Sequence, residues 1–171
     1  MDNQQTCIIL CGNIGCGKST VADYLLDNHK DEKIVVICND GIITMCHNGH
    51  YRNYKPALQG MYKDMFKRCL CAAIDAGCDV ICDNTHETEI KRREIFAIAK
   101  AADMRVVGID LGPGSPETLK RRQDADDGRD IPDSTWAMVH QRTAEKYQPM
   151  DIDEGFDEII TREEIEEVMY G

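Results

Sequence analysis

The sequence predicts an α/β fold of three layers, in which a central, mostly parallel sheet of five strands lies between helices. Two observations carry this prediction. Short, continuous apolar runs of the kind expected for strands buried on both faces recur along the chain. Between them lie longer segments whose apolar residues repeat at helical spacing. Strands that alternate with helices in this way form parallel, doubly wound sheets.

The expected strands are short and rich in β-branched residues and cysteine. The first, 6–11, reads Thr-Cys-Ile-Ile-Leu-Cys and leads into a glycine-rich turn. The second, 33–38, is another continuous apolar run. The remaining strands are expected at 78–82, 104–110 and 156–160. Runs of this length, bounded by turn residues, are typical of buried strands.

The expected helices follow the apolar periodicity. Residues 18–28 form the first, and Pro56 begins a longer one that Gly77 ends. The apolar side chains expected along one side of the longer helix are Leu58, Met61, Met65, Cys69, Leu70 and Ile74. Residues 89–102 follow the pattern Ile90, Ile95, Ala97, Ile98 and Ala101. The intervening segment 40–54 has mixed polarity, which indicates a loop with a short helix.

The last third of the chain is more polar. A Ser-Pro-Glu helix start at 115–117 leads through a basic helix into a charged link, and Pro132 begins another helix. We expect residues 119–132 to form a helical lid. Thr161 and Glu164 have the spacing of a capping box at the start of a final helix.

Length and charge limit the class of protein. The 171 residues suffice for one domain with a buried core, so 1–171 is expected to be a single domain. The net charge is −11, of which −8 falls in the acidic segment 151–171, interpreted as a solvated helix face. Such a total does not favour tight binding along nucleic acid but permits contact with a strand end.

The chain has no sign of membrane targeting. No apolar run reaches the ~20 residues needed to span a bilayer. The first five residues carry no positive charge ahead of the apolar run that follows, which argues against a signal peptide. We therefore expect a cytoplasmic protein without a membrane partner.

Nine cysteines lie between Cys7 and Cys82 without a C-x-x-C pair. Most belong to apolar runs, as expected for small core residues in a reducing compartment. Metal binding by Cys46, His47 and His50 is the alternative, although no fourth ligand stands at zinc-like spacing.

A phosphate-binding loop follows the first strand. Its residues are Gly12, Asn13, Ile14, Gly15, Cys16, Gly17, Lys18, Ser19 and Thr20, and they match G-x-x-x-x-G-K-[ST] between a buried strand and a helix. Glycines let backbone N–H groups turn toward phosphates at the helix N-terminus. Lys18 is expected on the β- and γ-phosphates of ATP and Ser19 on Mg²⁺. No N-K-x-D run for guanine occurs, so a GTPase is not favoured.

Two further strands end in acids. Asp40 follows the second strand and Asp83 ends the third. The carboxyl ends of parallel strands line the ligand crevice of doubly wound folds. Asp40 is therefore a candidate to accept the proton of an attacking hydroxyl, and Asp83 a candidate to hold magnesium or orient Ser19. The alternative for each is a helix or turn cap.

Over roughly residues 6–147 the chain resembles the kinase domain of polynucleotide 5′-hydroxyl kinases, within the AAA_33/zeta-toxin-like group of P-loop kinases. The resemblance rests on the loop 12–20, on Asp40, on the turn Asp83-Asn84-Thr85-His86 and on the basic helix leading to Pro132. It implies a three-layer P-loop kinase fold, ATP and Mg²⁺ on Lys18 and Ser19, and Asp40 as general base. It also implies a supporting Asp83 and Arg122 as a lid residue near the phosphates.

Two positions depart from the family pattern. The family has an arginine on the acceptor's phosphate where this chain has Ile43, and a second lid arginine where it has Asp126. Arg129 is a candidate to replace the second, and Arg52 or Lys55 the first.

These observations predict an ATP-dependent kinase whose acceptor is a hydroxyl, first of all the 5′-hydroxyl of DNA or RNA. The alternatives are a kinase acting on a modified base, a nucleoside or another small metabolite, and a non-enzymatic, ATP-dependent regulatory module. The basic run 91–93 is interpreted as a solvated helix face, with the acceptor groove as the alternative. Packing is favoured for Trp136, and base stacking is considered for Tyr51 and Tyr54.

Overall fold

The computed structural model describes residues 4–30, 33–125 and 129–171. Within them the strands are β1 Thr6–Cys11, β2 Ile34–Ile37, β3 Asp79–Asp83, β4 Arg105–Asp110 and β5 Glu158–Thr161. The helices are α1 Lys18–Asn28, α2 Asn39–Cys46, α3 Gln59–Asp75, α4 Glu89–Ala101, α5 Pro116–Asp124, α6 Asp133–Lys146 and α7 Arg162–Tyr170. Short 3₁₀ helices cover Tyr51–Asn53, Pro56–Leu58 and Ile152–Glu154.

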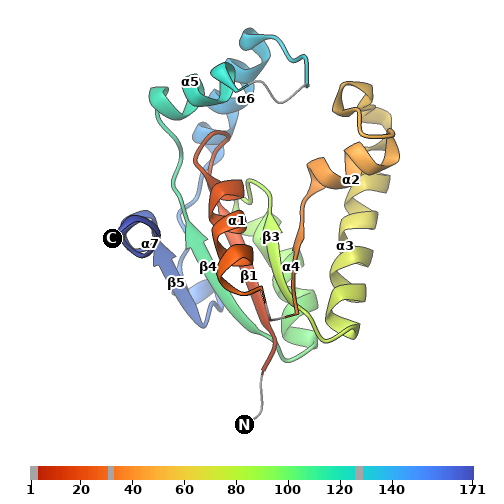
Figure 1. The fold of residues 1–171 in the computed structure, drawn as a ribbon, viewed down its shortest axis with the longest axis vertical. Helices are drawn as coiled ribbons and strands as arrows, with labels where there is room; N and C mark the ends of the chain where they lie inside the picture. Colours follow the sequence, from red (N-terminus) through yellow and green to blue (C-terminus); the bar gives the residue numbers. More distant parts are fainter. Residues whose placement is uncertain (1–3, 31–32, 126–128) are drawn as a thin grey trace.

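The five strands form one sheet in the order β2-β3-β1-β4-β5, and each of the four pairings is parallel. This confirms the predicted three-layer α/β fold. Because the strands are parallel, their carboxyl ends meet at one edge, with β1 in the middle. The loops after β1, β3 and β4 therefore lie next to one another, below α5 and α6 in Figure 1.

Two apolar clusters cover the two faces of the sheet. Cys7 and Ile9 of β1 belong to the cluster that α3 and α4 complete, whereas Leu10 belongs to the one that includes Val21 of α1 and Ile165 of α7. This alternation is the two-residue period of a strand whose neighbouring side chains point to opposite faces. Figure 1 shows α1 and α3 on different sides of the sheet. Within the described ranges no helix combines the length and apolarity needed to cross a membrane.

The segment after β2 contains the short helix expected within 40–54. This helix, α2, has eight residues and begins at Asn39, so Asp40 lies in its first turn. The helix start was not evident because its N-cap is Cys38, whose sulfur accepts a hydrogen bond from the amide of Gly41 at 3.2 Å. The residues that usually cap helices carry side-chain oxygens.

The buried faces of α3 and α4 were also only partly predicted. In α3 the buried residues are Tyr62, Phe66 and Leu70, while Met61 is 41% exposed. In α4, Ile90 is exposed and Phe96 is buried. The other apolar residues expected on α3 lie in the core or pack against it, as do Ile95 and Ile98 of α4. The aliphatic pattern therefore located both faces but left out the aromatic side chains that reach the core from its edge.

Candidate active site

The loop that joins β1 to α1 needs glycine for steric reasons. Gly15 has φ +73°, and a Cβ atom there would lie 2.0 Å from the carbonyl oxygen of Thr118 in α5. Gly17 has φ +94° and immediately precedes α1 without a side-chain cap. The first amides of α1 are therefore left for an external acceptor, as in phosphate-binding loops.

The side chain of Asn13 anchors this loop to neighbouring segments. It is fully buried, and its amide nitrogen donates to two backbone carbonyls that belong to the loop before α5 and to α6. The carbonyls are those of Pro113, at 2.6 Å, and His140, at 2.9 Å. The backbone amides of Gly12 and Asn13 donate to Thr85 and Gly112 in the neighbouring loops. The cradle is thus fixed by the surrounding fold before any phosphate binds.

Lys18 lies inside this cradle. Its Nζ donates to the carbonyl oxygens of Gly12 at 3.0 Å and Asn13 at 2.8 Å. Burial lowers the pKa of Lys18, and the negative charge of Asp83 acts in the opposite direction. An ammonium held by backbone carbonyls within a glycine-rich loop suits the oxygens of a polyphosphate.

Ser19 and Asp83 form the candidate magnesium site. The Ser19 hydroxyl donates to Oδ2 of Asp83 at 2.8 Å. Burial raises the pKa of Asp83, while the hydrogen bond from Ser19 and the charge of Lys18 lower it. Hydroxyl and carboxylate oxygens are hard ligands, and Mg²⁺ usually takes one or two carboxylates together with phosphates and water. These two side chains fit that pattern.

The alternative metal site in the loop after α2 does not form. Among the described residues no group of three His, Cys, Asp or Glu side chains is arranged to hold a metal ion. His47 instead contacts the Tyr62 hydroxyl at 2.7 Å. The ordinary-loop interpretation fits this contact.

Asp40 lies on the β2–β3 side of the loop. It contacts Arg129, which the sequence did not suggest. Nη1 of Arg129 donates to its Oδ2 at 2.5 Å, across 89 positions of sequence. The Asp40 side chain is 45% exposed and that of Arg129 is 25% exposed. The negative charge of Asp40 also acts on Lys18 and on Asp83. The predicted base, metal ligand and loop lysine therefore share one electrostatic environment.

The other cations proposed for this region have different surroundings. Arg122 lies with its guanidinium 4.1 Å over the ring of Trp136, so that pair packs α5 against α6. Arg52 and Lys55 are exposed in the segment after α2. Two positions differ from the family pattern. Ile43 is only 4% exposed, in the core, and does not reach the site. Asp126 lies outside the described residues, as do residues 127–128 of the expected lid.

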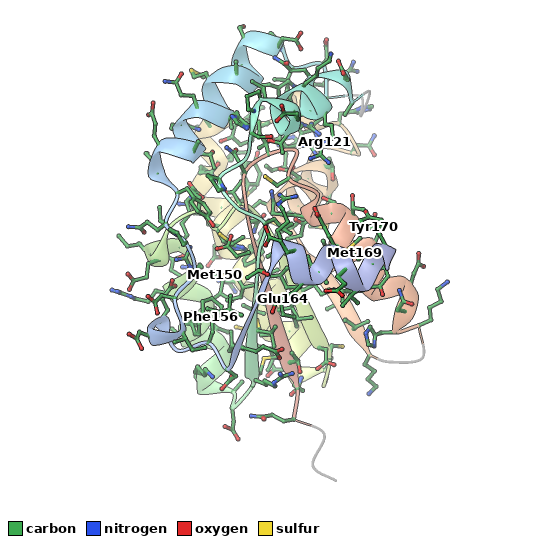
Figure 2. The ribbon with its side chains drawn as sticks, turned by 90° about the vertical axis from the view of Figure 1, so that its left-hand side faces the viewer. Arg121, Met150, Phe156, Glu164, Met169 and Tyr170 are labelled. Carbon is green, nitrogen blue, oxygen red and sulfur yellow. The ribbon has the colours of Figure 1, made fainter. Side chains whose placement is uncertain are left out.

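On the other side of the loop, next to β4, lies a cavity that sequence analysis missed. Its volume is about 580 Å³. The lining includes Thr118 and Arg121 of α5, Tyr147, and Arg162 and Glu163 of α7. Figure 2 looks at this face, with Arg121 above α7 and its labelled residues Glu164, Met169 and Tyr170. The lining comes from four separate segments, so no single stretch of sequence indicated the cavity. The only local sign was the Gly-Pro-Gly turn at 112–114, which follows a strand.

The two sides of the loop can be named by these features. We call the region of Asp40, Tyr51–Lys55 and Arg129 the Asp40 side, and the region of the 580 Å³ cavity the cavity side. They lie beyond opposite edges of β1, because β3 and β2 flank it on one side and β4 and β5 on the other. The loop 12–20 lies between them.

A buried arginine supports the Asp83 turn. Arg92 is fully buried in α4, against both interpretations of the basic run. It donates to both carboxylate oxygens of Glu154, at 2.8 and 2.5 Å, and to the carbonyls of His86 at 2.9 Å and Gln148 at 3.0 Å. The interpretation of the acidic segment as a solvated face was thus incomplete. Glu154 neutralises a buried charge that fixes the turn after β3.

Several solved structures share this fold. A protein of the Pnkp1/Rnl/Hen1 RNA repair complex aligns with a TM-score of 0.66 and 20% identity over 86% of this chain. A fungal RNA kinase aligns with a TM-score of 0.59 and 20% identity, over 93% of this chain and 76% of its own. APS kinase of Mycobacterium tuberculosis, in complex with AMPPNP and APS, aligns with a TM-score of 0.64 and 15% identity, over 96% of this chain and 95% of its own. This chain spans 48% of the length of the first protein.

Sequence comparison with curated proteins found no match. The AAA domain family AAA_33, however, matches residues 7–150. That range contains the phosphate loop, Asp40, Asp83 and both candidate lid arginines. With most of its length matched, the chain belongs to the AAA_33 family of AAA domains and has a P-loop kinase-like α/β fold.

Proposed function

We propose that this protein transfers the γ-phosphoryl group of ATP to a hydroxyl, and that the preferred acceptor is the 5′-hydroxyl of a DNA or RNA strand. The observation that carries the proposal is the clustering of Lys18, the Ser19–Asp83 pair and Asp40 at one end of the sheet. A phosphate cradle, a hard-oxygen metal site and a carboxylate base are the parts that phosphoryl transfer to an alcohol requires.

The donor is assigned to the loop and the cavity side. The backbone and side chains of residues 12–20 would hold the phosphates, with Lys18 on the β- and γ-phosphates. The 580 Å³ cavity would take the base and sugar, because it opens beside the loop and its lining combines polar side chains with one aromatic ring, Tyr147. Bound Mg²⁺, on Ser19 and Asp83, would supply positive charge to the phosphate oxygens.

The acceptor is assigned to the Asp40 side. Asp40 would take the proton of the acceptor hydroxyl as its oxygen forms a bond to the γ-phosphorus. The bond between that phosphorus and the bridging oxygen breaks, and ADP leaves with the electron pair. Lys18, Arg122 and Arg129 would neutralise charge on the transferring group, the last two as part of a lid at 119–132. We take residues 1–171 as a single domain for this chemistry.

A strand end is preferred for two reasons. Arg52 and Lys55 are exposed beside Asp40 and provide positive charge for a backbone, although the chain as a whole is acidic. Two of the structural neighbours are described as an RNA kinase and as part of an RNA repair complex.

A small-molecule acceptor is the second candidate, and one observation favours it. Ile43 is in the core, so no cation at that position can hold a phosphate of the acceptor. The fold is also similar, over nearly the full length of both chains, to an APS kinase. A nucleoside or another metabolite with a free hydroxyl would fit a site of this kind.

Transfer from ATP labelled at the γ-phosphoryl group tests the proposal. The acceptors compared are a 5′-hydroxyl oligonucleotide, the same strand with a 5′-phosphate, and a panel of nucleosides, each with and without Mg²⁺. We expect label only on the 5′-hydroxyl strand and only with magnesium. Label on a free nucleoside would establish the second candidate, and label on the blocked strand would indicate a base or internal hydroxyl. Binding of ATP without transfer to any acceptor would contradict the enzymatic proposal.

A further inference from the structure

Three side chains on the Asp40 side form a closed set of contacts. Arg129 is paired with Asp40 at 2.5 Å. Its guanidinium carbon also lies 4.7 Å from the ring centroid of Tyr51. Burial and the charge of Asp40 raise the pKa of Tyr51 to about 12, against the charge of Arg129, and a hydrogen bond between the Tyr51 hydroxyl and the Asp40 carboxylate acts in the same direction as burial. Each side chain therefore touches the other two.

Tyr51 is the fixed member of this set. Its ring stacks on Tyr54, with centroids 6.1 Å apart and planes inclined by 13°. Tyr54 in turn lies 5.8 Å from Tyr62, which is fully buried. A column of aromatic rings thus extends from the core to the guanidinium of Arg129. A cation over an aromatic face is held by the ring quadrupole.

The contact with Arg129 conflicts with the work of a general base. Oδ2 of Asp40 already accepts a hydrogen bond from Nη1 of Arg129, so this oxygen is occupied where the acceptor hydroxyl would have to donate. The same guanidinium is also the kind of group that binds phosphate oxygens in a planar fork. Asp40 acts electrostatically on Lys18 of the phosphate loop, so phosphates bound there would lie in the same field as the Asp40–Arg129 pair.

We propose that Arg129 is a shared cation with two alternative anionic partners, Asp40 and the donor's phosphates, and that Tyr51 positions it for the first. This inference rests on the proposed function, since it takes the loop as the ATP site and Asp40 as the base. When the phosphates attract Arg129, the carboxylate is released. The acceptor hydroxyl therefore meets a free base only after the donor has bound. Arg129 thus couples binding of the donor's phosphates to the release of the Asp40 carboxylate.

The proposal makes a prediction about ATP binding that needs no acceptor. If Asp40 competes with the phosphates for Arg129, removing the Asp40 charge must strengthen donor binding, because coupling between two partners of one group is reciprocal. We expect Asp40→Asn to lower the Kd for Mg²⁺-AMPPNP by about 1.4- to 5-fold, the range of a partly exposed ion pair. Titration calorimetry measures this directly.

A double-mutant cycle separates this competition from simple repulsion between a carboxylate and phosphates. We expect Arg129→Gln to weaken AMPPNP binding, and Asp40→Asn to have no further effect in that background. Tyr51→Leu should tighten binding by about 2- to 5-fold without any change of charge, because Arg129 loses the ring that holds it. Tyr51→Phe keeps the ring and should tighten binding less. Thermal unfolding of each variant confirms that it is folded.

Asp23→Asn is the matched control. Asp23 is exposed on α1, and its charge acts on Asp83, so it removes the same charge near the loop without touching Arg129. A gain from Asp23→Asn equal to that from Asp40→Asn would overturn the proposal, as would a gain from Asp40→Asn that persists with Arg129→Gln. No gain at all would overturn it as well, while leaving the proposed kinase standing.

The outcomes also separate this proposal from the proposed function. Failure of the unaltered chain to bind AMPPNP would sink both. Coupling between Asp40→Asn and Arg129→Gln together with no labelled acceptor would support the shared cation and reject the transfer reaction. Labelled acceptor without coupling between the two substitutions would support the transfer reaction and reject the shared cation.

Discussion

The phosphate loop and the Asp40 side differ in how far apart in sequence their parts lie. The phosphate loop is one continuous run of residues, 12–20, that follows β1 and ends in the first turn of α1, and backbone contacts to the loops after β3 and β4 hold it. The Asp40 side is assembled from the start of α2, the segment 51–55 and Arg129, which is 89 positions away from Asp40. Local geometry thus determines the phosphate site, whereas the Asp40 site exists only where distant segments meet.

This difference has a consequence for mutation. A defect in the loop should affect every reaction of the protein, because each needs the donor's phosphates. A defect at Asp40 or Tyr51 should affect transfer while leaving donor binding intact or stronger, whereas loss of Arg129 should weaken donor binding as well. The predictions below test that division, beginning with the largest expected effect.

Lys18→Met should abolish transfer to all acceptors, with a loss of about 1,000-fold or more, because the side chain stabilises charge that develops on the phosphates. AMPPNP binding should weaken as well. Lys63→Met, at an exposed position of α3, is the matched control and should leave both unchanged. Transfer that survives Lys18→Met would reject the assignment of the donor site.

Asp40→Asn should lower kcat by about 100-fold or more, because an amide cannot take the acceptor's proton. Donor binding should not weaken, in contrast to Lys18→Met. Steady-state kinetics with saturating ATP measure the first effect and calorimetry the second. An unchanged kcat would show that Asp40 only caps a helix or turn, and the contrast between the phosphate loop and the Asp40 side would fail.

His86 joins the turn after β3 to β1 and should make the fold sensitive to acid. It lies after β3, and its Nδ1 donates to the carbonyl of Leu10 in β1 at 2.8 Å. Burial lowers its pKa to about 4. Below pH ~6.5 the unfolded chain binds a proton that the folded chain refuses, so stability should fall by about 3 kcal/mol between pH ~6.5 and ~4.

Urea unfolding at several pH values checks this dependence. His86→Asn should flatten the slope, since asparagine tolerates the observed φ of +43° and does not titrate. His50→Asn changes an exposed histidine and should not. An equal slope in all three proteins would assign the acid sensitivity to other groups.

Gly15→Ala should destabilise the protein by about 1–3 kcal/mol and weaken AMPPNP binding, because its Cβ would collide with Thr118 of α5 in a left-handed backbone conformation. Gly60 in α3 has open space around the same substitution, so Gly60→Ala should stabilise by up to about 1 kcal/mol. Denaturant unfolding compares the two. A neutral Gly15→Ala would show that the loop is not held against α5.

Arg52→Ala and Lys55→Ala should have the smallest effects. Each should raise KM for a 5′-hydroxyl oligonucleotide by about 3- to 10-fold, reduce its salt dependence and leave kcat unchanged. Lys63→Ala, on another exposed surface, should change nothing. The same KM shift with a nucleoside acceptor would show that these cations do not read a strand backbone.

Much of the fold was predictable because its signals are local. The apolar runs located all five strands to within two residues, and the capping box of α7 formed as its Thr161–Glu164 spacing indicated. A short helix was expected within 40–54, but its start could not be placed because a cysteine caps it. Arg92 was misassigned because nothing in its own helix shows that Glu154 neutralises it from 62 positions away.

The sequence alone determined the phosphate loop, the parallel sheet and the acids at its carboxyl edge, since each depends on residues that are neighbours in the chain. Only the tertiary structure decided which groups surround them: the cavity beside β4, the buried Arg92–Glu154 pair, and Arg129 on Asp40 and Tyr51. The physical reason is that charge pairing and cavity shape are set by distances in space. The order of strands brings together residues whose separation in sequence carries no sign of it.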